Sequence, residues 1–591
     1  MMCKYKNLLS TIKLILRIAA PSTILLLVLT IISGLLPGLL VIVEEDFINT
    51  VVAFTSTINV QAIIVQFFLF AFVLLLEWLV AIVNKYFFIV NKESIRRNIY
   101  KMMFLAVKNV AFKNLEEAAN QDLVMRVFKT PEIHLSRLIK NSLTLLKYAV
   151  TIGSLFVLLF NQIGIKSFII IIASILVAVV AKKGGKRVYD LEVENSGEKR
   201  RVDYFDSMIM DKEFADERIL FSFFKKINNK WKKKATGLIE QQAKLNKIIF
   251  AQEKTASIVL YIISFVIILL LVGPVKNGRI TIGFMIAFVN ATFNLSNMVS
   301  RIFADALSKI YEEIGYVKDF WRLQDLSVVK KVTYGDRALE TINSIQFRNV
   351  SFKYPGTEKY VLKNCSFRME GNRKYALIGI NGAGKSTIVK LIKGLYCDYE
   401  GTILINDINL REFSAENFST EVAVVSQDFS KFQVSFLENI NLGRKHEIED
   451  NTKILDMFEK LNFNKLTNDI NLNSKIGKIY PENIDLSLGE WQKLAISRAL
   501  LSEASLLIFD EPTASLDPLA EQRVYDQILD LSRNRMSILI SHRLGSVKSS
   551  EDIYLLEEGQ VKMHGSHEKL MRNSDLYREM YNKQKGWYQD A

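Results

Sequence analysis

Hydrophobic residues in the first half of the chain gather in runs long enough to cross a lipid bilayer. A helical span needs about 20 apolar residues, and six stretches come near this length: 18–43, 62–91, 142–160, 165–181, 256–273 and 279–296. The second half has no such run, and its short apolar segments are typical of an α/β protein. We therefore predict an all-α domain of six transmembrane helices followed by an α/β domain.

The segments that join these runs alternate in charge. Segment 44–59 holds no Lys or Arg, 161–166 holds one and 273–280 holds two, whereas 92–140 holds ten and 182–247 holds seventeen. Cytoplasmic loops of membrane proteins are enriched in Lys and Arg. We therefore expect a multi-pass protein of the cytoplasmic membrane, with both long loops and both termini in the cytoplasm. The net charge of +14 has the same origin, so the lipid bilayer and not nucleic acid is the expected partner.

The two long loops are rich in Glu, Lys, Leu and Ala, which predicts helices that extend the spans into the cytoplasm. Residues 1–17 carry one apolar stripe with basic residues elsewhere, which favours a helix lying at the membrane surface. The alternative is a positively charged flank of the first span. The predicted organisation is an interfacial helix at 1–17, a transmembrane domain at 18–320 with cytoplasmic loops 92–140 and 182–247, a linker at 321–342 and an α/β domain at 343–591.

Polar side chains inside the apolar runs are candidates for function, because ionisable groups are costly at membrane depth. Glu77 either faces a polar cavity or is paired inside the helix bundle. Asn290 and Asn294 lie four residues apart, and they either line a path or tie helices together. The three cysteines have no paired or metal-ligand spacing, so neither a disulfide framework nor a zinc site is expected.

A glycine-rich segment between a strand-like and a helix-like run has the spacing of a phosphate-binding loop, or P-loop. Its expected ATP contacts are Gly379, Asn381, Gly382, Gly384, Lys385, Ser386 and Thr387. The glycines let backbone N–H groups surround phosphates at a helix N-terminus. Lys385 adds a positive charge there, and the hydroxyl of Ser386 can bind Mg²⁺. ATP and Mg²⁺ are therefore the predicted cofactors.

Two carboxylates follow the apolar run 505–509, which has the form of a buried parallel strand. The carboxyl end of such a strand meets the ligand crevice. We expect Asp510 to hold the Mg²⁺ shell. Glu511 is expected to orient and deprotonate the water that attacks the γ-phosphate.

Segment 484–493, Ile-Asp-Leu-Ser-Leu-Gly-Glu-Trp-Gln-Lys, together with the P-loop, resembles the signature of ATP-binding cassette (ABC) proteins. Six spans followed by one cassette resemble the layout of an exporter half-transporter. Within that class, 215–221 and the Glu-Trp-Gln-Lys of the signature are most similar to bacterial exporters of lantibiotics and other modified peptides, with multidrug exporters the broader match.

The resemblance implies further site residues. Tyr354 resembles the aromatic residue that stacks on adenine, Gln427 the glutamine that contacts Mg²⁺ and water, and His542 the histidine that contacts the γ-phosphate. The other implied ATP contacts are Ser487, Gly489 and Glu490 of the signature, and Asp517 of the loop that crosses the dimer interface. Catalysis is thus assigned to Glu511, Gln427 and His542, and Mg²⁺ binding to Ser386, Gln427 and Asp510.

The signature departs from the usual Leu-Ser-Gly-Gly-Gln at two positions. Leu488 stands where the family has the first glycine, and Glu490 where it has glutamine. A bulky Leu488 restricts close approach of a phosphate, so we expect slow ATP turnover. Glu490 is expected to lie beside the phosphate and to matter less.

The resemblance implies ATP-driven export of a peptide, lipid or amphipathic small molecule by alternating access. It also implies cytoplasmic tips at 116–122 and 214–220 that dock on the cassettes. Because the catalytic set is complete, we expect a homodimer, with a heterodimer as the alternative. The alternative functions are a metal-chelate importer and an ATP-gated regulator without stoichiometric transport.

Overall fold

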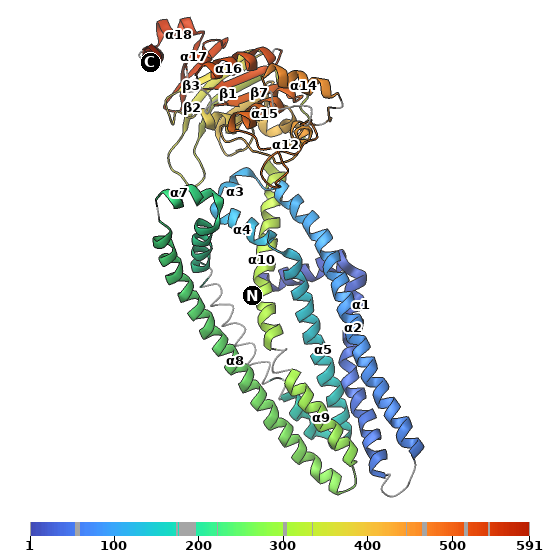
Figure 1. The fold of residues 1–591 in the computed structure, drawn as a ribbon. Coiled ribbons are helices and arrows are strands. Elements are labelled where there is room, and N and C mark those ends of the chain that lie inside the picture. Colours follow the sequence, from blue (N-terminus) through green and yellow to red (C-terminus); the bar gives the residue numbers. More distant parts are fainter. Residues whose placement is uncertain are drawn as a thin grey trace. The chain divides into compact units, whose positions relative to one another are not determined.

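The structure of the chain is a computed structural model (Figure 1). It describes residues 2–53, 60–172, 175, 195, 197–221, 223–298, 304–333, 335–444, 446–448, 450–463, 470–512, 518–532, 534–541 and 544–589. The chain divides into two units. Residues 1–108 and 121–325 form a helical unit, and residues 109–120 and 326–591 form an α/β unit.

The described part of the first unit is helical. Its helices are α1 (Met2–Ala53), α2 (Val60–Lys108), α4 (Ala118–Phe128), α5 (Pro131–Ile163), α7 (Ala215–Leu220), α8 (Phe224–Lys276), α9 (Ile282–Met298) and α10 (Ala304–Thr333), whose last residues belong to the second unit, with 3-10 turns η1 (Gly164–Ser167) and η2 (Lys212–Phe214). Helix α4 begins within the segment that belongs to the second unit.

Three helical stretches of the described residues are long and apolar enough to cross a membrane: Lys13–Ala53, Val60–Lys108 and Pro131–Ile172. Shorter apolar helices at Ser264–Lys276 and Ile282–Leu295 fall in the fifth and sixth predicted spans. Most of the fourth predicted span, 165–181, lies outside the described residues. The predicted fold class, a helical membrane domain joined to an α/β domain, is confirmed.

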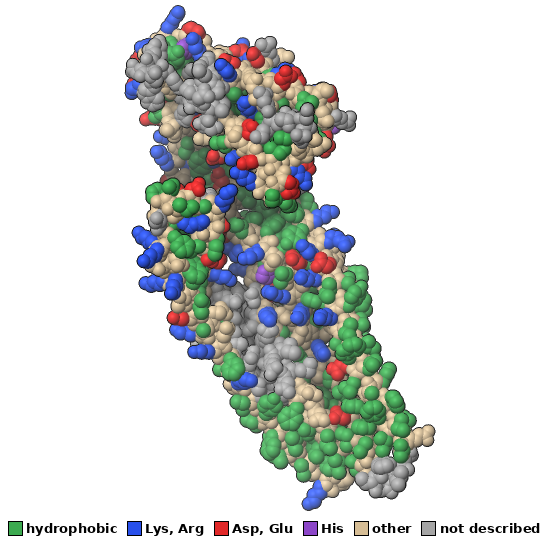
Figure 2. All heavy atoms as spheres, viewed as in Figure 1, with side chains coloured by type: hydrophobic (Ala, Val, Ile, Leu, Met, Phe, Trp, Pro, Cys, Tyr) green, Lys and Arg blue, Asp and Glu red, His purple; other side chains and the backbone are tan. Residues whose placement is uncertain are grey.

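Large apolar side chains cover much of the surface of the helical unit. On α2, for example, Phe68 is 66% exposed and Trp78 is 62% exposed. Figure 2 shows such side chains gathered toward one end of these helices, with Lys and Arg more frequent toward the other. An apolar surface of this kind is stable against lipid and not against water.

Helix α1 bends near the predicted boundary between the interfacial helix and the first span. Ala19 leaves the helical region (φ −137°, ψ 37°), and two amides of α2 bind the backbone and side chains around it. Asn98 Nδ2 donates to the carbonyl oxygen of Ile18 (3.0 Å) and Asn91 Nδ2 to Thr23 Oγ1 (2.8 Å). These bonds satisfy groups that the bend exposes.

One of the intramembrane polar residues has a partner on a neighbouring helix. Asn290 Nδ2 on α9 donates to Glu44 Oε1 on α1 (2.7 Å). This hydrogen bond favours the structural alternative for Asn290, in which its side chain ties helices together. The role of Glu77 stays a prediction.

Two β-sheets form the frame of the second unit. A four-stranded antiparallel sheet has the order β2-β1-β4-β5, with β1 (Ser344–Phe352), β2 (Leu362–Glu370), β4 (Glu400–Ile405) and β5 (Ile408–Asn409). A six-stranded sheet has the order β10-β9-β3-β8-β7-β6, with β3 (Lys374–Gly379), β6 (Val422–Val425), β7 (Leu506–Asp510), β8 (Met536–Ile540), β9 (Asp552–Glu557) and β10 (Gln560–Gly565). All of its strand pairs are parallel except β9–β10.

Helices surround these sheets. They are α3 (Phe112–Glu116), α11 (Lys385–Ile392), α12 (Ala415–Thr420), α13 (Phe436–Asn441), α14 (Asn451–Lys460), α15 (Leu488–Leu501), α16 (Pro518–Leu531), α17 (Leu544–Val547), α18 (His567–Asn573) and α19 (Asp575–Gln589), with a 3-10 turn η4 (Leu410–Glu412).

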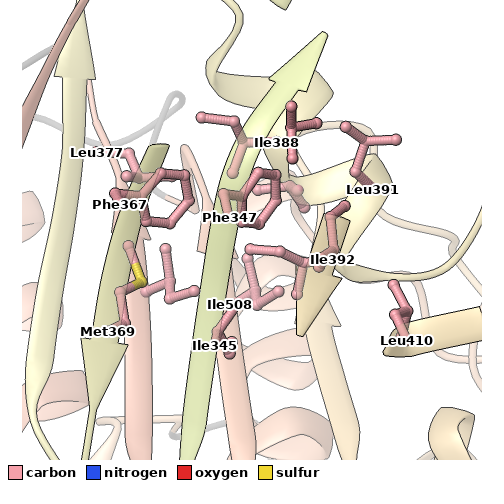
Figure 3. Packing of buried hydrophobic residues seen from close by; sticks show 14 of the residues in the cluster. Ile345, Phe347, Phe367, Met369, Leu377, Ile388, Leu391, Ile392, Leu410 and Ile508 are labelled. Atoms are coloured by element: carbon pink, nitrogen blue, oxygen red, sulfur yellow. The ribbon is translucent and has the colours of Figure 1, made fainter. Parts of the chain in front are cut away.

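The core of the second unit lies between the antiparallel sheet, the parallel sheet and α11. Figure 3 shows Phe347 beside Ile388 of α11, with Phe367 on the other side of Phe347, toward Leu377 of β3. The two phenylalanine rings are stacked, with their centroids 4.4 Å apart. This packing fixes α11 against the end of β3, where the glycine-rich loop lies.

Candidate functional site

Two of the predicted catalytic segments meet at the carboxyl edge of the parallel sheet. Strand β3 ends at Gly379 and strand β7 ends at Asp510, and β8 lies between these strands. Ligands of open α/β sheets bind outside the carboxyl ends of parallel strands. The sheet order therefore brings the P-loop and the acidic pair to one edge.

The backbone of the P-loop requires glycine. Gly379 has φ +154°, and a Cβ there would lie 2.3 Å from the carbonyl oxygen of Leu556. Gly384 has φ +103°, and its Cβ would lie 2.7 Å from Leu362 Cδ2. Gly382 has φ +81° but open space around it. The loop thus combines left-handed turns with close packing on β9 and β2, and glycine alone allows both without strain.

Lys385 is held inside the loop. Its side chain is nearly buried, and Nζ donates to the carbonyl oxygens of Gly379 (2.9 Å) and Ile380 (3.2 Å). Burial lowers the pKa of Lys385, and the charges of Glu511 and Asp510 act in the opposite direction. The loop carbonyls therefore hold the ammonium at the sheet edge where the acidic pair also lies, and a phosphate bound by the loop would meet it there.

Asp510 and Glu511 carry distinct signs of a functional site. Burial raises the pKa of Asp510, and Glu511 raises it further, while Lys393 and Lys385 oppose the shift. Glu511 has φ +48°, a left-handed conformation rare for a residue with a side chain, and its N–H donates to the carbonyl oxygen of Ile540 (3.0 Å). Strained backbone and perturbed carboxylates gather at active sites.

The three predicted Mg²⁺ ligands of the chain suit an ion that is held largely by phosphate and water. Among the described residues, no group of three or more His, Cys, Asp or Glu side chains could hold a metal alone. Ser386 and Gln427 are exposed, and Asp510 is half-buried. One carboxylate with a hydroxyl and an amide is typical of Mg²⁺ shared with a nucleotide.

Tyr354 lies beside the P-loop helix. Its hydroxyl is 3.0 Å from Thr387 Oγ1, which brings the predicted adenine-stacking residue to the predicted phosphate site. Gln427 lies in the turn directly after β6, the edge strand next to β7. Asp517 and His542 lie outside the described residues, so their roles stay predictions.

The signature begins helix α15 with a capping box. Ser487 is the N-cap, and its Oγ accepts from the N–H of Glu490 (3.3 Å), while Glu490 Oε2 accepts from the N–H of Ser487 (2.7 Å). Leu488 is 49% exposed beside them. The carboxylate of Glu490 thus lies at the helix N-terminus, which gives it a larger part than we expected from the sequence. The spacing of Ser487 and Glu490, three residues apart, is the sequence pattern of a capping box and could have predicted these bonds.

A groove of about 350 Å³ runs beside the edge strand β6. Its lining includes Val422, Phe432, Arg444 and Arg498. Burial lowers the pKa of Arg498 to about 10, and its guanidinium lies over the ring of Phe432 (4.8 Å to the centroid). Sequence reasoning did not predict this groove, because its lining comes from segments far apart in the chain.

Comparisons with known proteins agree with this geometry. The family model described as "ABC transporter" matches residues 362–514. The subtilin transport ATP-binding protein SpaT of Bacillus subtilis is 27% identical over 97% of this chain and 94% of its own length. The nisin transport ATP-binding protein NisT of Lactococcus lactis subsp. lactis is 26% identical over 97% and 95%, respectively. An ATP-dependent lipid A-core flippase of Escherichia coli (strain K12) is 26% identical over 75% of each chain.

A solved structure matches nearly the whole chain. The structure of a bacterial Atm1-family ABC exporter with ATP bound has a TM-score of 0.78 and covers 96% of this chain and 98% of its own, at 20% identity. At this identity the match shows the fold. Together, the cassette, the relatives that match nearly the whole chain and the fold make this chain similar to ATP-binding cassette exporters.

Proposed function

We propose that two copies of this chain hydrolyse ATP between their cassettes and use the cycle to export an amphipathic cargo from the cytoplasm. The observation that carries the proposal is that Lys385, Asp510 and Glu511 all follow strand ends at one edge of the parallel sheet. A phosphate-binding lysine, a metal-binding carboxylate and a strained second carboxylate are the parts that ATP hydrolysis needs.

Each of these residues has a distinct part in the reaction. Lys385 and the N–H groups of the P-loop neutralise the β- and γ-phosphates. Ser386, Asp510 and Gln427 would hold Mg²⁺, which would offset negative charge on the phosphates. Glu511 accepts the proton of the attacking water, and its fixed backbone orients the carboxylate. His542 contacts the γ-phosphate.

The second copy completes each site. The N-terminus of α15, with Ser487 and Gly489, closes on ATP held by the P-loop of the partner. Two ATP molecules then hold the two cassettes together, because the closed arrangement binds ATP more tightly than the open one. Hydrolysis removes this difference in binding. A homodimer suffices, because this chain carries both the P-loop set and the signature.

Tips of the cytoplasmic loops transmit the movement. Helix α3, in the first loop, packs on the cassette through Glu116. Helix α7, in the second loop, exposes Ile219 (75%) and Leu220 (77%), and Phe221 directly after it is 73% exposed. We infer that this apolar tip enters the groove beside β6 on the second copy. Both termini lie in the cytoplasm in this arrangement, as the loop charges predict.

The cargo is best described as a peptide. Two relatives that match 97% of the chain are named for transport of subtilin and nisin, whereas two flippases match 83% and 75% of it. The apolar spans fit an amphipathic peptide or lipid.

Transport into inside-out vesicles tests the direction and the coupling. ATP-dependent uptake of a labelled amphipathic peptide into such vesicles is the expected result. Uptake only into right-side-out vesicles would favour the metal-chelate importer class, and ATP hydrolysis without any movement would favour an ATP-gated regulator.

A further inference from the structure

The tip helix of the first cytoplasmic loop is bound to the cassette by one carboxylate. Glu116 ends α3, and its Oε1 accepts from Lys390 Nζ (3.1 Å), while Oε2 accepts from the hydroxyl of Tyr396. At the other end of α3, Phe112 packs edge-on against Tyr396, with ring centroids 5.9 Å apart. All of these residues belong to the α/β unit.

The predicted adenine platform is part of the same cluster. The ring of Tyr354 packs edge-on against Phe352 (5.2 Å, 78°) and against Tyr396 (5.6 Å, 83°). Its hydroxyl is hydrogen-bonded to Thr387 of the P-loop helix. These edge-on contacts orient the ring, and a base stacked on its face would hold it more firmly.

Lys390 is the cation that both groups share. Its Nζ lies over the ring of Tyr354, 5.1 Å from the centroid, as well as 3.1 Å from Glu116 Oε1. The Lys390–Glu116 pair is about two-thirds buried, with side chains 32% and 37% exposed. A partly desolvated ammonium is attracted by a ring face and by a carboxylate at once. Lys390 also lies on α11, which begins at the P-loop lysine.

We propose that Lys390 is a positioning residue that couples adenine binding on Tyr354 to the docking of α3 through Glu116. The proposal rests on the proposed function, in which Tyr354 stacks on adenine. A ring has two faces, and Lys390 lies over one of them, so the base takes the other. A base stacked on that face limits the motion of the Tyr354 ring. The Lys390 ammonium, which contacts the ring, then moves less, and so does the Glu116 carboxylate that it binds.

Such coupling is reciprocal. If adenine binding strengthens the docking of α3 by some factor, loss of that docking weakens ATP binding by the same factor. The effect depends on the base and not on the phosphates, because Lys390 reaches the ring of Tyr354. Loss of a cation–ring contact of this type corresponds to about a fivefold change in affinity.

Hydrogen exchange of residues 109–120 in the full-length protein tests the proposal. Protein carrying Glu511→Gln, which prevents turnover, is measured alone, with ATP and with inorganic tripolyphosphate, which has no base. ATP is expected to slow exchange in this segment, and tripolyphosphate is not. Lys390→Met and Glu116→Gln should each remove the ATP-dependent protection and weaken ATP binding about fivefold, with tripolyphosphate affinity unchanged.

Asp398→Asn is the matched control. Asp398 pairs with Lys113 on α3 but has no contact with Tyr354 among the described residues. This variant should lower protection of 109–120 with and without ATP, and should keep the ATP-dependent change. The double variant Lys390→Met, Glu116→Gln should bind ATP no more weakly than either single variant, because both break one chain of contacts.

Several results would overturn the proposal. They are ATP-dependent protection that survives Lys390→Met, equal protection by tripolyphosphate, or single-variant losses that add in the double variant. ATP binding without any protection of 109–120 would refute this inference alone. A chain that binds neither ATP nor tripolyphosphate would refute the proposed function as well.

Discussion

Replacement of Glu490 by glutamine should tighten ATP-dependent closure of the cassettes. The Glu490 carboxylate accepts from the Ser487 N–H at 2.7 Å, so its charge lies at the helix N-terminus that the proposed function gives to the partner's γ-phosphate. Two like charges within one helical turn, roughly 5 Å, repel by about 1 kcal/mol in water. A neutral amide keeps the backbone hydrogen bond and removes this repulsion.

The expected result is a KM for ATP about fivefold lower than that of the wild type, since about 1 kcal/mol corresponds to that factor. Steady-state ATP hydrolysis by the full-length protein in lipid nanodiscs measures it. The cap itself is expected to lose only a few tenths of a kcal/mol, which thermal unfolding checks.

Glu438→Gln provides the control. Glu438 forms the same capping box with Ser435 at the start of α13, with a Ser435 N–H to Glu438 Oε2 distance of 2.8 Å. This variant should change stability to a similar degree as Glu490→Gln and leave the KM unchanged. A KM that stays the same or rises in Glu490→Gln, or that falls equally in both variants, would refute the reasoning.

Further variants test other parts of the site. Leu488→Gly should raise the maximal ATPase rate, because it removes an exposed bulky side chain at the N-terminus of α15; no increase would contradict a restrictive role. Gly379→Ala should lower the melting temperature more than Gly382→Ala does, because only the first variant places a Cβ against the backbone oxygen of Leu556 (2.3 Å). Equal losses of stability in the two variants, each near the roughly 1–2 kcal/mol of left-handed strain, would contradict this. Glu511→Gln should retain ATP binding while hydrolysis falls by about a hundredfold or more, measured by nucleotide trapping; a variant that still turns over at the wild-type rate would exclude Glu511 as the base.

The architecture and the P-loop could be predicted from sequence because their signals are local. Runs of apolar residues mark the spans, and the glycines from Gly379 to Gly384 lie where a strand-like run meets a helix-like one. The structure starts helix α11 at Lys385, directly after these glycines. The sheet order then brings Asp510 to the loop, as the strand-end argument expects.

Contacts between distant segments could not be predicted. Glu116 meets Lys390 across 274 positions and Tyr396 across 280, and no sequence periodicity connects them. The first tip was expected at 116–122, but the structure has helix α3 at Phe112–Glu116, because Glu117 adopts an extended conformation (φ −74°, ψ 117°). The sequence analysis also missed Lys393, whose charge opposes the rise in the pKa of Asp510, because this effect depends on packing.

The central claim is that nucleotide held by the cassettes drives movement of the membrane helices. Paired measurements of ATP hydrolysis and cargo uptake, on purified protein in liposomes, test it most directly when wild type is compared with Lys385→Met. The account predicts that the wild type consumes ATP and accumulates an amphipathic peptide, and that Lys385→Met loses both activities together. Hydrolysis or uptake that persists in Lys385→Met would contradict the account.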